Sequence, residues 1–245
     1  FSGSVPTSLP SVSIPFGIGR NGGSADGYFK GIVDDCRIYN RVLSTAEIQQ
    51  LYKQGGGKIS KSPTNITTGL NTGLVGWWTF DGQDFTSPVT TTDKSISGNN
   101  GTLVGGVTKT AGKIGQALKF DGVDDYVNGG NSILSGNTGA FSVSGWFKSG
   151  YSGGSQTLFG KDDRSAGVDN KMFQVQMTVG GESIGGSTIV GYVWDDSAGA
   201  YLGSSYTSAV TNNKWHFVTF TYNGGTAQGS VQLYVDGVAG TGTYS

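Results

Sequence analysis

The chain has 245 residues, of which 16 are basic and 17 acidic, so its net charge is −1. This balance argues against a nucleic-acid binder or a polybasic membrane binder, because both need a cationic face. No apolar run reaches the roughly 18–20 residues that span a bilayer. The 44 glycines follow no collagen period, and 35% hydrophobic residues are enough to build a core. The composition therefore predicts a globular, glycine-rich, all-β chain.

Two residue types are scarce. The chain has one cysteine, Cys36, and one histidine, His216, which excludes an internal disulfide and a Cys/His zinc cluster. A single cysteine fits a reduced compartment and equally a bacterial exoprotein. Only Glu47 and Glu182 are glutamates, and they cannot form locally the glutamate pair of a β-sandwich glucanase. We therefore expect no catalytic residue and no enzyme activity.

In chain order, the first predicted element is a short helix near residues 44–54. Ser44 and Glu47 form a capping box, in which each side chain satisfies a free amide group of the other residue. Ile48, Leu51 and Tyr52 follow at helical spacing, and Gly55 ends the helix. Residues 54–73 are then rich in glycine and polar residues, which predicts a flexible linker.

From residue 74 onward, short alternating runs are separated by glycine, asparagine and aspartate, a pattern typical of antiparallel strands. Asp236 and Gly237 follow the last of these runs and predict a two-residue hairpin turn. Many short strands with little helix indicate a sandwich of two sheets. The predicted strands are 74–80, 117–127, 140–148, 172–179, 215–222 and 231–235.

Several of these runs resemble one family. The similar segments are 73–82 (GLVGWWTFDG), 112–127 (GKIGQALKFDGVDDYV), 141–147 (FSVSGWF), 214–218 (KWHFV) and 233–237 (LYVDG). In this order they resemble a laminin-G-like domain of the concanavalin A-like lectin/glucanase family. The resemblance implies an all-β fold, an antiparallel two-sheet jelly-roll sandwich.

The closing segment of that family resembles residues 31–52, which here precede the opening segment. We expect three parts: residues 1–53 with the closing strands and helix, the linker 54–73, and the main part of the domain at 74–245. Three explanations remain open. The chain is one period of a tandem array, or residues 1–53 complete a neighbouring copy by strand donation, or the chain closes on itself as a circular permutant.

The resemblance also implies one structural calcium ion. By strict alternation, Asp34 points to the same side as Ile32, Cys36 and Ile38, where an unpaired carboxylate needs a cation or several amide donors. Asp35 points to the other side and could pair with Arg37. Related jelly rolls hold calcium with an aspartate at this position, so Asp34 is the first candidate ligand. Asp81 and Asp121 are the weaker candidates, and the alternative is that all three only fix turns.

An aromatic and acidic cluster is the candidate contact for a glycan or a partner, because aromatic platforms and planar polar groups bind sugars. The alternative is a solvated loop with Trp194 packed into the sandwich. Asn65 and Asn100 match N-glycosylation sequons. The cluster residues are Tyr192, Trp194, Asp195, Asp196 and Tyr201.

Two functions follow as expectations. The first is an extracellular or cell-surface adhesive repeat, of prokaryotic type, that assembles with adjacent copies of itself into an array or filament through a shared sandwich. The second is a calcium-dependent carbohydrate-binding module that contacts glycans or cell-surface glycoproteins. We expect no nucleic acid partner and no membrane insertion.

Overall fold

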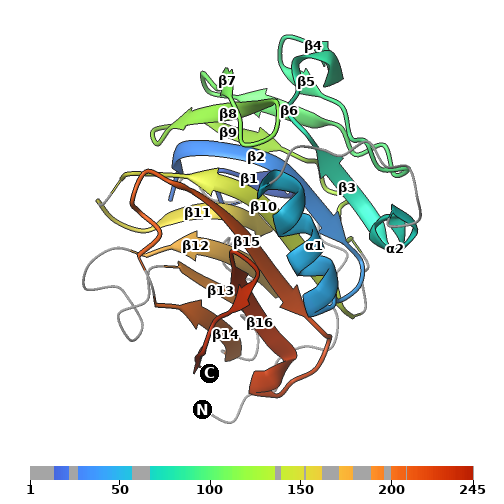
Figure 1. Cartoon of the computed structure of the whole chain (residues 1–245), viewed down its shortest axis with the longest axis vertical. Coiled ribbons are helices and arrows are strands. Elements are labelled where there is room, and N and C mark those ends of the chain that lie inside the picture. Colours follow the sequence, from blue (N-terminus) through green and yellow to red (C-terminus); the bar gives the residue numbers. More distant parts are fainter. Residues whose placement is uncertain are drawn as a thin grey trace.

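The structure is a computed structural model. It describes residues 14–21, 27–56, 67–135, 139–151, 153–161, 171–178, 189–195, 200–207 and 209–244. Within these residues the chain forms two antiparallel sheets that face each other, as predicted (Figure 1). Two helices, α1 (Thr45–Gly56) and α2 (Thr67–Asn71), accompany the sheets. No helix in the described ranges is long and apolar enough to cross a membrane.

The larger sheet, sheet A, has ten strands. In spatial order they are β18 (Gly242–Tyr244), β14 (Ala200–Tyr206), β13 (Ile189–Asp195), β12 (Lys171–Met177), β11 (Gln156–Lys161), β1 (Gly17–Ile18), β9 (Tyr126–Asn128), β6 (Gly101–Val104), β5 (Thr90–Thr91) and β4 (Phe85–Ser87).

The smaller sheet, sheet B, contains the closing strand near its centre. Its strands are β17 (Val238–Ala239), β16 (Val231–Val235), β15 (Trp215–Tyr222), β10 (Phe141–Lys148), β2 (Lys30–Tyr39), β8 (Gln116–Asp121) and β7 (Thr108–Ala111). Strand β3 (Leu74–Trp78) also pairs with β2. Asp236 and Gly237 both have positive φ and join β16 to β17 by the predicted two-residue turn.

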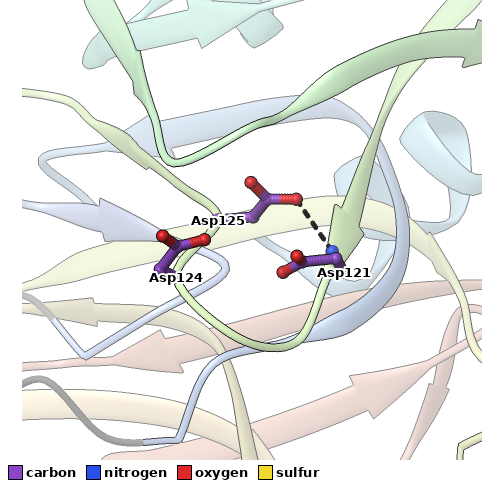
Figure 2. A group of neighbouring side chains, drawn as sticks. All are labelled: Asp121, Asp124 and Asp125. Atoms are coloured by element: carbon purple, nitrogen blue, oxygen red, sulfur yellow. Dashed lines mark hydrogen bonds between the residues drawn. The ribbon is translucent and has the colours of Figure 1, made fainter.

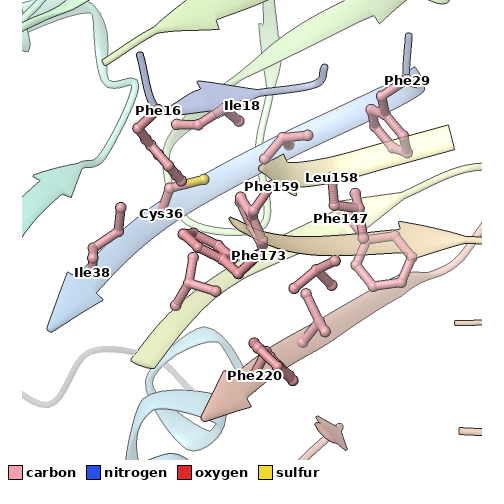
Figure 3. Packing of buried hydrophobic residues seen from close by; sticks show 14 of the residues in the cluster. Phe16, Ile18, Phe29, Cys36, Ile38, Phe147, Leu158, Phe159, Phe173 and Phe220 are labelled. Atoms are coloured by element: carbon pink, nitrogen blue, oxygen red, sulfur yellow. The ribbon is translucent and has the colours of Figure 1, made fainter. Parts of the chain in front are cut away.

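The main core lies between the inner faces of the two sheets (Figure 3). Alternation along β10 places Phe141, Val143 and Phe147 in this core. The ring of Phe141 in sheet B lies 4.7 Å from that of Phe173 in sheet A, measured between centroids. Cys36 is fully buried in the same core and free of any disulfide. The core therefore joins residues from the whole length of the chain.

A second, smaller core lies on the outer face of sheet B, where α1 crosses the sheet (Figure 1). The ring of Tyr52 in α1 stacks on Trp146 of β10 at 5.5 Å. Ser44 and Glu47 form the predicted capping box, with the Ser44 amide donating to Glu47 Oε2 at 2.8 Å. The amide of Glu47 donates to Ser44 Oγ at 3.3 Å. The helix is therefore fixed at its start by caps and along its length by aromatic packing.

Part of the predicted linker is ordered. Residues 67–71 form α2, whose Leu70 is buried in the second core, while residues 57–66 lie outside the described ranges. The guanidinium of Arg41 donates to the carbonyl oxygens of Gly69 and Thr72, each at 2.7 Å. These contacts tie α2 to the end of β2, which corrects the prediction of a linker through residue 73.

The closing segment completes the sandwich of its own chain. Strand β2 pairs with β10 on one side and with β8 and β3 on the other, and all three strands belong to the same chain. The structure therefore has the self-closed arrangement, and residues 14–53, as far as they are described, do not need a neighbouring copy to find their partners. This corrects the expectation that residues 1–53 complete another copy.

Candidate functional site

A β-bulge at Asp35 sets the direction of the acidic side chains on β2. Asp35 has a positive φ of 46°, and the pairing of β2 with β10 shifts register between Ser144 and Trp146. Asp34 is therefore opposite Trp146, a member of the outer core, whereas Cys36 lies in the core between the sheets. The prediction that Asp34 shares a side with Cys36 is wrong, because the extra residue interrupts the alternation.

Asp35 itself forms the predicted pair with Arg37. Its Oδ2 lies 3.1 Å from Arg37 Nη2, and its Oδ1 accepts a hydrogen bond from the indole nitrogen of Trp77 at 2.6 Å. The Arg37 guanidinium lies over the Trp77 ring at 4.5 Å. Trp77 and Trp78 thus point to opposite sides of β3, since Trp78 is buried in the main core. Asp35, Arg37 and Trp77 thus bind one another on the outer face of sheet B, while Arg37 Nε has no hydrogen-bond partner among the described residues.

Asp34 and Asp81 hold the same turn, which connects β7 to β8. Asp34 Oδ2 accepts from the amides of Lys113 and Ile114, both at 2.8 Å. Asp81 Oδ1 accepts from the amide of Gln116 at 2.8 Å. The structure therefore brings two of the predicted metal ligands to one turn, where they bind backbone amides.

Asp34 is fully buried beneath this turn. Burial raises the pKa of its carboxyl group to about 7, against the opposing effect of the two amide donors. Its Oδ1 has no hydrogen-bond partner among the described residues. The two amide donors therefore occupy one oxygen of the predicted calcium ligand, and the other oxygen is buried without a partner among the described residues.

Asp121 belongs to a different group, formed with Asp124 and Asp125 after β8 (Figure 2). One carboxylate oxygen from each residue lies within 4.8 Å of the others. Asp125 is buried, and its Oδ2 accepts from the amide of Asp121 at 2.8 Å, while its Oδ1 accepts from the amide of Gly106. Oxygen ligands at this spacing suit Ca²⁺, which binds six to eight oxygens.

The predicted glycan contact forms an aromatic strip on the outer face of sheet A. Tyr192 and Trp194 alternate along β13 with the core residue Val193, so both point away from the core. Their ring centroids are 6.3 Å apart, and Trp194 pairs across strands with Tyr201 of β14. Tyr201 is 41% exposed, whereas Tyr192 and Trp194 are half-buried. Together they form a platform over two neighbouring strands.

A polar chain continues from this strip toward β11. The hydroxyl group of Tyr192 donates to Gln174 Oε1, and Gln174 Nε2 donates to Thr157 Oγ1. These bonds fix the orientation of the Gln174 amide on the same outer face. Sequence reasoning missed Gln174, although its alternation with Phe173 and Val175 was a usable signal. Gln174 is itself buried, so its amide holds the Tyr192 hydroxyl group and is not part of the exposed face.

The other predicted residues have different outcomes. Asp196 and Asn65 lie outside the described residues, and of Asp195 only the backbone, at the end of β13, is described. Asn100 is exposed, and its Oδ1 accepts from the amide of Asp93 at 3.0 Å. The sequon at Asn100 is therefore at the surface.

His216 has both ring nitrogens engaged. Its Nδ1 lies 2.8 Å from Asp236 Oδ2, and its Nε2 lies 3.1 Å from Asn212 Oδ1. The other oxygen of Asp236 accepts from the amide of Phe217 at 2.8 Å. This arrangement fixes the β16–β17 turn against β15.

Comparison with known proteins agrees with this architecture. Residues 121–244, just over half of the chain, match a laminin-G-type family model described as the concanavalin A-like lectin/glucanases superfamily. The chain belongs to this superfamily. The match covers β9 to β18, so the inverted order of the segments before residue 121 stays a prediction. Neither the curated proteins nor the solved structures gave a match to the chain.

Proposed function

We propose that this superfamily member is a non-catalytic glycan-binding module of an extracellular or cell-surface protein, with the aromatic strip as its binding surface. The observation that carries the proposal is that Tyr192, Trp194 and Tyr201 gather on one outer face, where the buried amide of Gln174 holds the Tyr192 hydroxyl group in place. Aromatic faces stack on the C–H faces of sugar rings. The surface therefore offers the stacking contact that a neutral glycan uses.

Binding without cleavage is supported by the engagement of the acidic side chains. Glu47, the one glutamate in the described residues, pairs with Arg41 at 2.6 Å at the start of α1. Asp34 and Asp81 hold the amides of a turn. Most glycoside hydrolases use two carboxyl groups that flank the scissile bond. None of these carboxylates lies on the face that carries the strip.

The experiment is affinity electrophoresis in gels containing cellulose, xylan, mixed-linkage glucan or galactan. The wild-type protein should be retarded by at least one neutral polysaccharide, and Trp194→Ala should lose this retardation by about tenfold or more, given that a stacked aromatic is worth on the order of 1–2 kcal/mol. Trp215→Ala is the matched control, because Trp215 packs on the opposite sheet. Equal retardation of Trp194→Ala and wild type would contradict the proposal.

A structural calcium ion is the second proposal, supported by the donor atoms of Asp121, Asp124 and Asp125. The ion would link the turn after β8 to Gly106, whose amide already binds Asp125. Calcium would then stabilise one edge of the sandwich. This proposal replaces Asp34 and Asp81 as ligands and keeps Asp121.

A self-closed chain can still serve in an adhesive array, provided that each sandwich is a separate unit of the array. Closed sandwiches can be joined end to end as independent units of an array, and each unit then presents its own aromatic strip to a glycan surface. Several weak sites on one polymer raise the apparent affinity, because binding by one unit raises the effective concentration of the next. We propose this form of array in place of a sandwich shared between copies.

A further inference from the structure

Three polar side chains form a row across sheet B, on the face that α1 covers (Figure 1). Arg37 of β2 pairs in register with Ser144 of β10, and Ser144 pairs with Thr219 of β15. Ser144 follows Val143 and Thr219 follows Val218, both in the main core, so alternation turns the two hydroxyl groups to the outer face. We call Arg37, Ser144 and Thr219 the polar row.

The polar row lies inside the outer core. On one side of it is Tyr39, the next outward residue of β2, and on the other side is Trp146, the next outward residue of β10. Helix α1 supplies apolar side chains to the same core and closes it from above. Ser144 and Thr219 have no exposed surface, and only 9% of Arg37 is exposed. The hydroxyl groups of the row are therefore cut off from bulk solvent.

Each member of the polar row has a buried polar atom without a protein partner. Ser144 Oγ, Thr219 Oγ1 and Arg37 Nε form no hydrogen bond within the part of the chain that the structure describes. Directly opposite residues on neighbouring strands have Cβ atoms about 5 Å apart, so these three atoms belong to one small region. Buried polar groups in folded proteins nearly always have a partner, because leaving one unpaired costs its full desolvation energy. Three unpaired atoms in one row therefore point to a bound molecule.

The neighbouring hydroxyl groups on the same strands differ from those of the polar row. Ser142, the outward residue before the row on β10, donates from its Oγ to the carbonyl oxygen of Arg41 at 2.8 Å. Thr221, the outward residue after the row on β15, donates from its Oγ1 to the carbonyl oxygen of Gln232 at 3.3 Å. Hydroxyl groups on this face can thus find protein partners, and those of the polar row do not.

We propose that the polar row is a binding site for ordered water, enclosed between α1 and sheet B. Arg37 Nε can only donate a hydrogen bond, whereas each hydroxyl group can both donate and accept. The bound molecule must therefore accept from the guanidinium and exchange hydrogen bonds with the two hydroxyl groups. One water molecule can do this with three partners, the usual number for buried water.

The charges around the polar row favour water over an ion. Arg37 Nη2 lies 3.1 Å from Asp35 Oδ2, so the carboxylate already neutralises the guanidinium and leaves no excess charge for an anion. Arg37 Nε offers a cation a hydrogen atom and no lone pair. Enclosure by α1 also favours a molecule as small as water over a larger polar ligand. The site is independent of the aromatic strip, which lies on the outer face of the other sheet.

The first test is a high-resolution crystal structure of the intact chain. Wild type should show an ordered solvent peak at hydrogen-bond distance, about 2.7–3.2 Å, from at least two of the three unpaired atoms. Ser144→Ala/Thr219→Val removes both hydroxyl groups and should lose this peak. Unpaired atoms without a solvent peak, or density for a larger molecule, would overturn the proposal.

The second test uses the sign of a stability change. Valine has nearly the shape of threonine, so Thr219→Val removes the hydroxyl group and little else. If this group binds water, the melting temperature of Thr219→Val should fall by about 2–4 °C. Thr221→Val is the matched control, because it removes a hydroxyl group with a protein partner from the same strand and should fall similarly. In a dry row, Thr219→Val would instead remove an unpaired buried group, so a melting temperature equal to or above that of wild type overturns the proposal.

Discussion

Asp34 on β2 and Asp81 beyond the end of β3 accept hydrogen bonds from the same β7–β8 turn, although they are 47 residues apart in the sequence. Asp34 binds the amides of Lys113 and Ile114, and Asp81 binds the amide of Gln116, each at 2.8 Å. This β7–β8 turn also covers the Asp34 side chain, which is fully buried. The two carboxylates therefore join the closing strand, the end of the opening strand and the edge hairpin of sheet B.

The first prediction is a loss of stability with rising pH. Burial raises the pKa of Asp34 from 3.8 to about 7 in the folded protein. The folded state therefore binds a proton more tightly than the unfolded state, so the stabilising contribution is complete below about pH 4 and is lost as pH rises through 7. Relative to Asp34→Asn, wild type should lose up to about 4 kcal/mol of unfolding free energy between pH 4 and 8.

Urea denaturation of both proteins at pH 4.5 and 8 measures this difference. Asp81→Asn is the matched control, because it removes a carboxylate from the same turn and leaves Asp34 in place. The free energy of unfolding of Asp81→Asn should depend on pH in the same way as that of wild type, because Asp34 still titrates in this variant. A constant difference between wild type and Asp34→Asn across this pH range would contradict the assignment.

The second prediction concerns calcium. If Asp121, Asp124 and Asp125 bind the ion, calcium at a hundredfold excess over its dissociation constant adds about 2.7 kcal/mol to the stability of the folded state. The melting temperature should fall in chelator, and Asp124→Asn should abolish this difference. Asp34→Asn should retain it. Equal melting temperatures of wild type with and without chelator would contradict the proposal.

The third prediction tests the start of α1. Ser44→Ala removes the hydroxyl group that caps the Glu47 amide, and a lost cap costs about 1 kcal/mol. The hydrogen bond from Arg41 lowers the pKa of Glu47 to about 2, so Glu47→Gln should also destabilise the fold at pH 7. Gln49→Ala, an exposed change on the same helix, is the control and should be neutral. Chemical denaturation of the three variants measures these effects, and equal stability of Ser44→Ala and the control would count against the cap.

The fourth prediction concerns assembly. A sandwich that closes within one chain should give a monomer of 25.4 kDa at all concentrations in multi-angle light scattering. Strand donation would instead give dimers or longer assemblies that persist on dilution. Such assemblies would restore the shared sandwich as the arrangement in solution.

Much of the fold follows from local pattern, because alternation and turn chemistry act over a few residues. The strand β10, the Asp236–Gly237 turn and the capping box of α1 were all predictable in this way. The direction of Asp34 was not, since a single residue with positive φ at Asp35 reverses the alternation after it. The helix α2 was missed because its five residues are held by contacts from Arg41 and not by their own periodicity.

The candidate sites also differ in how far local sequence pattern predicts them. Tyr192, Trp194 and Tyr201 were predictable as one cluster, since β13 and β14 are neighbours in both sequence and space. The shared role of Asp34 and Asp81 was not, because it depends on tertiary contacts alone.

The central claim is that a glycan binds on the aromatic strip, and the five tryptophans of the chain allow a direct measurement. Their indole N–H groups give separate signals in a ¹H–¹⁵N correlation spectrum, and Trp194→Phe and Trp215→Phe assign two of them. On titration with an oligosaccharide of the polysaccharide that retards the protein, the Trp194 signal should shift saturably while the Trp215 signal stays in place. A saturable shift of Trp215 with an unmoved Trp194 would place the glycan on the opposite sheet and contradict the account.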